Sequence, residues 1–355
     1  MSDIRINNLR SRFESLAVDG MLVYQPENRK YLSGFDGSSG YLLVTPTDSV
    51  LATDFRYVEQ AQGEVGGCRV QRIEGPIKTW FSGLVSDAKV KRLGIEAGHA
   101  TLADFERFKV ALETAGIKTD LVPVIDAVES LRMIKDADEI KTIEAAARLT
   151  DEALVSVTYK YLRPGVSEIK LAWELEKYIR ESGAELSFPT IVAAGPASAM
   201  AHSKPSDRLL EVKGPVVIDM GVKLNGYCAD LTRTFWLADV NSKFTELYRI
   251  VLQAQKAAID GIVPGMTGAE ADKLARDYIA EAGYGEAFGH SLGHGLGMVV
   301  HENPRLGQNS QDILTEGMVF TIEPGIYITG WGGIRIEDDV VLENGKVRLL
   351  TSSPK

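Results

Sequence analysis

The sequence has little cysteine: Cys68 and Cys228 are the only two among 355 residues, and they lie far apart. Small secreted domains that depend on disulfides carry more cysteines at closer spacings. Two isolated thiols therefore give no disulfide framework and favour a reducing compartment. We expect a cytoplasmic protein.

Long apolar runs are also missing, because no stretch approaches the ~20 residues that a helix needs to cross a bilayer. The N-terminal residues MSDIRINNLRSRFESL do not form a signal-peptide pattern. They have the period of an amphipathic helix with four apolar side chains inward, Ile6, Leu9, Phe13 and Leu16. We expect no membrane partner.

Positive charge is in deficit, since 39 Lys and Arg residues face 49 Asp and Glu residues and the net charge is −10. The basic residues are interspersed with acidic ones and form no patch, so phosphate would be repelled. We expect no nucleic-acid partner. An acidic chain suits a protein that gathers carboxylates around a cation.

The length favours two domains. Up to about residue 125 the pattern predicts an α/β unit without a catalytic constellation. Its expected elements are strands at Met21–Tyr24, Tyr41–Val44, Val50–Thr53 and Arg92–Ile95, and a helix near Leu102–Ala115. The stretch from Leu131 to Leu162 then has the pattern of one long helix. We place the boundary just before it, with domains 1–127 and 128–355.

A weak internal repeat marks the second domain. RPGVSEIKLAWELEKYIRESGAE, from Arg163, resembles VPGMTGAEADKLARDYIAEAGYG, from Val263. Each copy has a Pro-Gly turn, a Ser or Thr cap and an amphipathic helix that ends at Gly. Two related halves predict a pseudo-symmetric domain with a site between them.

The stretch from Asp219 to Trp236 has the pattern of a β-hairpin, because Asn225-Gly226 is a strong turn signal between two alternating runs. Asp219 and Asp230 then share one face. They are directly opposed if the loop is Leu224-Asn225, and diagonal after one step of slip. Like charges so close destabilise a sheet, although a solvated hairpin end would explain this pair equally well.

GHSLGHGLGMVVH, which ends at His301, contains three of the five histidines. His290 and His294 have the i, i+4 spacing of a helical metal pair. The alternate glycines that follow His290 argue against a helix. We therefore expect loop and strand here, with the backbone running close to a ligand.

Two further acids lie in apolar surroundings. Glu323 comes directly before Pro324, at the end of the predicted strand in MVFTIEPGIYI. GGIRIEDDVVLENG is predicted as a single strand with alternating faces: Ile334, Ile336 and Asp338 on one, Arg335, Glu337 and Asp339 on the other. A structural salt bridge would explain either acid alone.

Taken together, these acids and one imidazole predict a metal centre, with the ligands Asp219, Asp230, His294, Glu323 and Glu337. Such ligands suit Mn, Co, Zn or Fe. Four carboxylates would be neutralised by two divalent ions, roughly 3.5–4 Å apart if one Asp and one Glu bridge them. Metal-assisted hydrolysis is the chemistry that this set favours.

The motifs also resemble a known family. DMG, NGYCADLTRTF, HSLGHGLG, TIEPGIY and GGIRIEDDV are similar to those of the pita-bread metallopeptidases, in their prolidase and aminopeptidase P branch. ENRKYLSGFDGSSGYLLV looks like the non-catalytic N-terminal domain of that branch. The resemblance implies an α/β N-terminal domain of creatinase type. An α+β catalytic domain with the pita-bread (creatinase/aminopeptidase-like) fold and a pseudo-twofold repeat would follow it.

Carried over by resemblance, Asp219 and Asp230 hold one metal, Asp230 and Glu337 bridge, and His294 with Glu323 completes the other. Glu323 is also implied as the acid/base that handles the proton of the attacking hydroxide.

The resemblance assigns four more residues to substrate. His202 lines the proline pocket, and His301 bonds the scissile carbonyl or the tetrahedral intermediate. Arg305 pairs with the substrate carboxylate, and Arg335 orients a ligand beside the bridging Glu. We place His290 beside the ligands rather than among them.

The function implied is hydrolysis of Xaa-Pro bonds, first as a dipeptidase (prolidase). Aminopeptidase P activity on longer proline-containing peptides is the near alternative, and a non-hydrolytic peptide-binding module the remote one. The resemblance further implies a homodimer. Manganese is our first candidate for the two ions, with Co, Zn and Fe left open.

Overall fold

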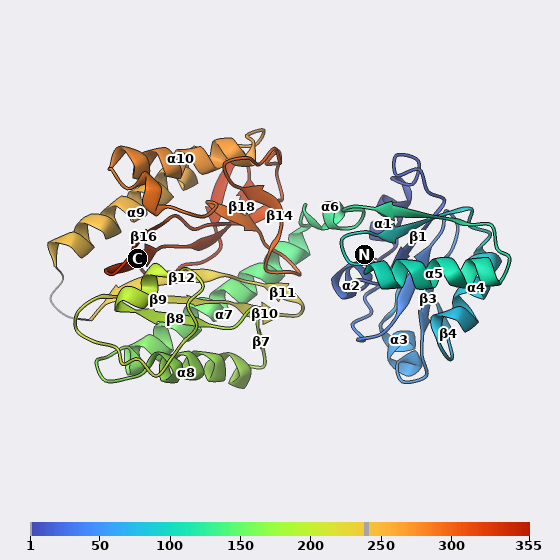
Figure 1. Cartoon of the computed structure of the whole chain (residues 1–355), viewed down its shortest axis with the longest axis horizontal. Helices are drawn as coiled ribbons and strands as arrows, with labels where there is room; N and C mark the ends of the chain where they lie inside the picture. The colour runs from blue at the N-terminus through green and yellow to red at the C-terminus, as the bar shows by residue number, and fades with distance from the viewer. Residues whose placement is uncertain (1, 238–240) are drawn as a thin grey trace. The chain divides into compact units, whose positions relative to one another are not determined.

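A computed structural model describes residues 2–237 and 241–355, and the chain divides into two compact units, Met1–Arg132 and Met133–Lys355 (Figure 1). No helix within the described residues combines the length and apolarity that crossing a bilayer requires.

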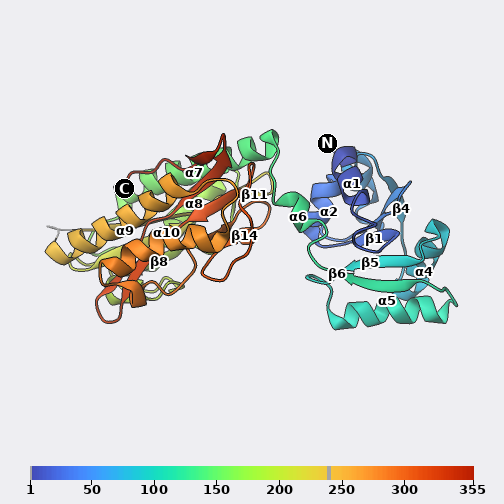
Figure 2. The same cartoon turned by 90° about the horizontal axis from the view of Figure 1, so that it is seen from above.

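Unit 1 is built on a six-stranded sheet of order β4-β3-β2-β1-β5-β6, in which β1, β2 and β3 are antiparallel and the outer pairs parallel. Helices α4 and α5 cover one face and α1 and α2 the other (Figure 2). The strands are β1 Gly20–Val23, β2 Tyr41–Val44, β3 Ser49–Thr53, β4 Arg69–Arg72, β5 Arg92–Glu96 and β6 Asp120–Val124. The helices are α1 Ser2–Arg10, α2 Pro26–Ser33, α3 Val58–Glu64, α4 Ile77–Ala88, α5 Leu102–Thr114 and α6 Glu129–Arg132.

The strands predicted from Met21, Tyr41, Val50 and Arg92 are present as β1, β2, β3 and β5. The first helix is shorter than predicted. It ends at Arg10, and the chain continues in tight turns up to Ala17, whose φ of 54° is left-handed. Phe13 is nevertheless buried.

Unit 2 places its sheets between two helix pairs, α7 with α8 and α9 with α10 (Figure 1). The helices are α7 Ala137–Tyr161, α8 Glu168–Glu181, α9 Ser242–Gly261 and α10 Gly268–Glu281, with short 3₁₀ turns η1 Gly195–Ala199 and η2 Gly285–Ala287. The first-half strands are β7 Glu185–Leu186, β8 Ile191–Ala194, β9 Pro215–Met220, β10 Val222–Leu224, β11 Tyr227–Cys228 and β12 Leu231–Trp236. The second-half strands are β13 Gly293–Gly295, β14 Glu302–Leu306, β15 Val319–Ile322, β16 Gly325–Ile328, β17 Gly332–Arg335, β18 Asp338–Glu343 and β19 Lys346–Leu349.

The helix predicted from Leu131 to Leu162 is two helices. The first, α6, does not continue into α7, because Asp136 caps the N-terminus of α7. Its side chain accepts from the backbone N–H groups of Asp138 and Glu139. Just before it, Lys135 donates its backbone N–H to Gly317 O. Capping chemistry and a sheet-like contact therefore override helix propensity here.

The internal repeat is confirmed at the level of backbone hydrogen bonds. In the first half Gly165 N–H donates to Leu210 O, and Leu210 N–H donates to Val166 O. In the second half Gly265 N–H donates to Leu314 O, and Leu314 N–H donates to Met266 O. The helices α8 and α10 have 14 residues each and start 100 positions apart. The second domain is therefore pseudo-symmetric, as the sequence predicts.

The hairpin closes at Asn225-Gly226, both with positive φ, so Asp219 pairs with Thr232 and Asp230 lies diagonal to it. The diagonal alternative is the one observed. Gly221 lies between β9 and β10, and only glycine fits there, because a Cβ would lie 2.0 Å from Ala229 O.

The single strand predicted through Arg335 and Asp338 is wrong. β17 pairs with β16, whereas β18 pairs with β15 and β19. Between them Glu337 donates its backbone N–H to Thr232 O instead. The change of partner breaks the strand at Glu337, one of the predicted ligands.

Candidate metal centre

The five predicted ligands come from strand ends of both halves of unit 2. Asp219 lies in β9, Asp230 directly before β12 and His294 in β13. Glu323 follows β15, and Glu337 lies between β17 and β18. Strand ends hold side chains more rigidly than surface loops do, so the group is fixed by the strands of several sheets.

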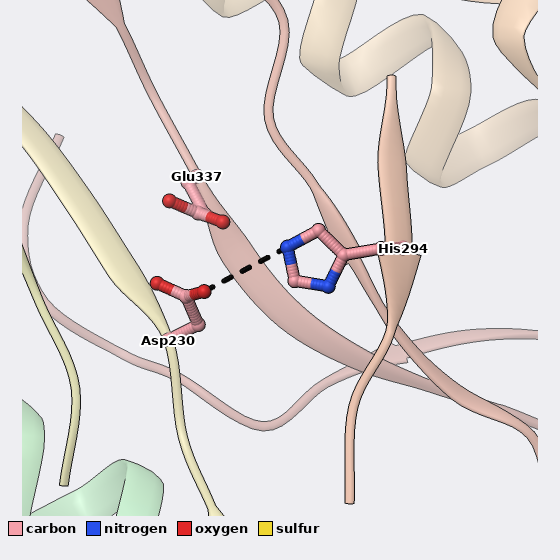
Figure 3. Close-up of side chains that lie close together, drawn as sticks. All are labelled: Asp230, His294 and Glu337. Carbon is pink, nitrogen blue, oxygen red and sulfur yellow. Dashed lines mark ion pairs between the residues drawn. The ribbon is translucent and has the colours of Figure 1, made fainter. Parts of the chain in front are cut away.

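Asp230, His294 and Glu337 each offer one ligand atom, and these atoms lie within 4.8 Å of one another (Figure 3). His294 Nε2 is 3.8 Å from Asp230 Oδ2 and 3.4 Å from Glu323 Oε1. Four of the five predicted residues are thus joined by close approaches, and all come from different strands or turns.

The imidazole of His294 is aimed by its own strand. Its Nδ1 lies 3.1 Å from Gly295 O, which fits an N–H donated to that carbonyl and leaves the Nε2 lone pair toward the carboxylates. Burial lowers the pKa of His294 to about 4, so the ring is neutral at pH 7. Glycine at position 293 lets β13 lie close to β15, because a Cβ there would lie 2.0 Å from Thr321 O.

Asp219 is held by Arg335, whose Nη2 donates to its Oδ2 at 2.6 Å. Arg335 Nε also donates to Thr232 Oγ1 at 3.1 Å, and that hydroxyl donates to Glu337 Oε2 at 2.5 Å. The guanidinium therefore ties Asp219 to Glu337 through one threonine.

Arg233 lies behind the site and is almost wholly buried. Its guanidinium donates to Glu337 O at 2.6 Å, to Asp338 Oδ1 at 2.7 Å and to Ser353 O at 2.8 Å. Asp151 in turn accepts the backbone N–H of Ser353 at 2.8 Å. The turn that carries Glu337 is thereby fastened to α7 and to the segment after β19.

Acidity in the cluster is strongly perturbed. Burial, together with the charges of Glu337, Asp219 and other acids, raises the pKa of Asp230 well above its usual range. Burial and the charges of Glu323 and Asp219 do the same for the pKa of Glu337. Burial raises the pKa of Glu323 to about 8 despite the opposing charge of Arg335. Such carboxylates repel one another and would ionise together around a cation.

The donor set fits divalent metal. Among the described residues Asp219 Oδ1 and Asp230 Oδ1 are buried without a hydrogen-bond partner. An unpartnered buried carboxylate oxygen is costly unless a ligand completes it. Carboxylate oxygens and one neutral imidazole nitrogen are the ligands that Mn, Co, Zn and Fe accept.

Three of the predicted substrate residues lie around this group at exposed positions. His301 is an exposed residue, but its ring is partly covered, since it stands edge-on to that of His294 with centroids 4.3 Å apart. Arg305 lies opposite His294 in the β13–β14 ladder with an exposed side chain. His202 is exposed in the turn after η1. The pKa of His301 is lowered mainly by burial and, to a smaller extent, by the charge of His202.

One residue of the site was missed at the sequence level. Tyr327, in β16, accepts from Arg335 Nη1 at 2.9 Å, and its hydroxyl lies 2.8 Å from His290 Nε2. His290 Nδ1 is 3.9 Å from Glu323 Oε2, so this chain of contacts borders the cluster. The tyrosine follows the TIEP motif closely, but nothing in the alternation distinguishes it from a packed aromatic.

The chain is similar to known proteins over most of its length. A model described as Metallopeptidase family M24 matches residues 141–344, and one of the Creatinase/Prolidase N-terminal domain matches residues 5–134. A relative from Pyrococcus furiosus, described as an Xaa-Pro dipeptidase, is 37% identical over 351 residues, 97% of each chain.

Two solved structures are similar over almost their whole length. One is described as an Xaa-Pro dipeptidase from Bacillus anthracis, with a TM-score of 0.96, 40% identity and coverage of 100% of this chain and 99% of the other. The second is described as an X-Pro aminopeptidase from Thermotoga maritima, with a TM-score of 0.88, 37% identity and coverage of 97% and 98%.

Proposed function

Since this chain belongs to metallopeptidase family M24, we propose that it hydrolyses Xaa-Pro peptide bonds and that its first activity is that of an Xaa-Pro dipeptidase. The observation that carries the proposal is the approach of Asp230, His294 and Glu337 within one small volume. Relatives described as Xaa-Pro dipeptidases match both units of the chain, which supports the same substrate class. Residues 128–355 would carry the reaction, and 1–127 would form the non-catalytic domain.

The ions would be held as the family resemblance implies. We assign Asp219 and Asp230 to one ion, His294 and Glu323 to the other, and Asp230 and Glu337 to both. Divalent ions in such a site lower the pKa of bound water and polarise a carbonyl. Manganese is our first candidate.

Glu323 is assigned the proton transfers. Its carboxylate is largely buried and lies beside the neutral His294. Ionised beside a cation, it would accept a proton from the attacking water and return it to the departing proline nitrogen. Burial also lowers the pKa of His301. A neutral His301 ring donates an N–H to the carbonyl oxygen that gains charge in the transition state.

The substrate is positioned by residues at the rim. The exposed guanidinium of Arg305 would pair with the C-terminal carboxylate of a dipeptide. His202 would line the proline subsite. Arg335 keeps Asp219 and Glu337 oriented. The prolyl bond has no N–H, so recognition must rest on the ring and on the carboxylate.

The test measures cleavage of an Xaa-Pro dipeptide by protein whose metal has been removed with a chelator and then restored. We expect chelated protein to lose turnover of an Xaa-Pro dipeptide and to regain it with added Mn²⁺. Chelated protein that cleaves at the full rate would refute the proposal. Restoration by each of Mn, Co, Zn and Fe would rank the metals.

Aminopeptidase P activity is the second candidate, since the Thermotoga maritima relative is described as an X-Pro aminopeptidase. Faster release of the N-terminal residue from an Xaa-Pro-Yaa tripeptide than from the Xaa-Pro dipeptide would favour it. Binding of both peptides without cleavage would instead favour a non-hydrolytic module. The cytoplasmic location and the homodimer stay predictions, the latter measurable by sedimentation.

A further inference from the structure

The loop that carries His202, residues 195–209 (the His202 loop), is held near both ends by one carboxylate, that of Glu168. Directly before the loop, Ala194 N–H donates to Glu168 Oε1 at 2.8 Å. Near its other end, Ser206 donates its N–H and its hydroxyl to Oε2 at 3.1 and 2.7 Å. Glu168 itself is fully buried in the first turn of α8.

Arg208 adds a charged contact, because its Nη1 lies 3.3 Å from Glu168 Oε1. Apolar packing does not close the base of the loop. A cavity of about 160 Å³ lies there, and its lining includes Ala194, Gly195, Pro196, Arg208, Gly214 and Val216. Backbone bonds also reach the loop, from Ile169 N–H to Ser206 O and from Glu168 N–H to Arg208 O. The carboxylate of Glu168 is the side-chain group that joins the two ends of the loop to each other.

The second half of the repeat lacks this device. Its backbone bonding is the same, since Gly268 N–H donates to Asp312 O much as Glu168 N–H donates to Arg208 O. Position 268, however, has no side chain, and a Cβ there would lie 2.0 Å from Arg305 O. The segment at Arg305 lies directly on α10, whereas the His202 loop is separated from α8 by the buried carboxylate of Glu168.

We propose that Glu168 is a positioning residue that sets the place of the His202 loop and, through His202, the subsite for the proline ring. The proposal rests on the Xaa-Pro function and deepens it. Glu168 touches neither the predicted ligands nor the reacting atoms, so its effect should fall on substrate binding rather than on turnover.

The test compares Glu168→Gln with Glu181→Gln, a matched control at the exposed end of the same helix. Glutamine keeps the side-chain length but removes the charge and one acceptor oxygen. We expect KM for an Xaa-Pro dipeptide to rise about tenfold and kcat to change less than about twofold. Glu181→Gln should match the wild type, and bound metal should be equal in all three proteins.

A double-mutant cycle with His202→Ala distinguishes positioning from general loosening. If Glu168 acts through His202, Glu168→Gln raises KM no further once His202 is alanine. Two effects that multiply would overturn the proposal. Should Glu168→Gln not fold, Ser206→Ala changes an exposed residue instead. It removes the hydroxyl bond to Glu168, together with the bond that this hydroxyl accepts from Arg208 N–H, and should raise KM about threefold. An unchanged KM in Ser206→Ala would count against Glu168.

Hydrogen–deuterium exchange of residues 194–209 supplies a readout without substrate. Glu168→Gln should speed exchange at Ala194 and Ser206, and Glu181→Gln should not. Wild-type cleavage together with unchanged KM and unchanged exchange in Glu168→Gln would refute the positioning role and leave the function standing. Wild-type protein that cleaves no Xaa-Pro bond would refute the function, and with it the proline subsite.

Discussion

Both units bury carboxylates, but they surround them differently. In unit 1 the carboxylate of Glu96 accepts backbone N–H bonds from Tyr24 at 2.7 Å and Gln25 at 2.9 Å, and a side-chain bond from Asn28 at 2.7 Å. In unit 2 the charges that act on the pKa of Asp230 are those of other acids, and its Oδ1 has no hydrogen-bond partner.

The difference teaches how a structural acid is told from a ligand. A buried acid is tolerated when donors converge on it, and Glu96 satisfies that condition. A buried acid among acids is tolerated only when a proton or a cation intervenes. Burial alone, which the two sites share, does not distinguish them.

The largest effect should follow from Asp230→Asn. Loss of the shared ligand should reduce turnover of an Xaa-Pro dipeptide at least about 10³-fold. The melting temperature of metal-free protein should not fall, because the amide replaces a carboxyl group that holds a proton when no cation is bound. Turnover and calorimetry on the same preparation check both statements. Turnover near the wild-type rate would remove Asp230 from the site.

The converse change is Glu96→Ala. It leaves the donors of Tyr24, Gln25 and Asn28 without their acceptor, so unit 1 should lose about 3 kcal/mol of stability. Metal content should stay at the wild-type level. Exchange protection of β5 measures the first effect and elemental analysis the second. A loss of metal would show that the contrast between the two acids is misplaced.

Metal should stabilise one unit only. Mn²⁺ at 100 times its dissociation constant should add about 2.7 kcal/mol to the part of the chain that binds it. Protection of β12, β13 and β18 should therefore rise on loading of chelated protein, while that of β5 should not change. Equal gains in β5 and β18 would contradict a site confined to unit 2.

The smallest effect concerns pH. Burial raises the pKa of Glu96 from 4.5 to about 7, so the folded state holds this proton more tightly than the unfolded state does. Its stabilising contribution is complete below about pH 4.5 and is lost as pH rises toward 7, by about 2 kcal/mol between pH 5 and 7. Protection of β5 in wild type and Glu96→Gln across this range checks the sign, since the variant should lack the slope.

The five ligand candidates could be identified from sequence because each acid or histidine stands at the end of an apolar strand pattern. Spacing cannot show what lies across the fold, and it therefore missed Tyr327, whose contacts with His290 span 37 positions. It also missed the strand break at Glu337, which follows from a bond to Thr232 more than 100 positions away. Local alternation continued through that break without any sign of it.

The fold shows the same limit. Pro-Gly turns and capping residues were sufficient to predict the repeat, because each signal is local. The shortened first helix and the cap at Asp136 were not predicted, since turn geometry and a contact with Gly317 decide them. Glu168 illustrates the point further: it matches an ordinary first-turn acid in sequence, and only the fold shows the loop it holds.

Arg233 joins Glu337 to Ser353, and Asp151 holds Ser353 to α7 across 202 positions. During synthesis, a chain still attached to the ribosome cannot make these bonds until Ser353 has emerged. The turn that carries Glu337 is thus completed late, after the other predicted ligands have left the exit tunnel. Vectorial synthesis therefore delays a fully assembled centre until Ser353 can reach Arg233 and Asp151.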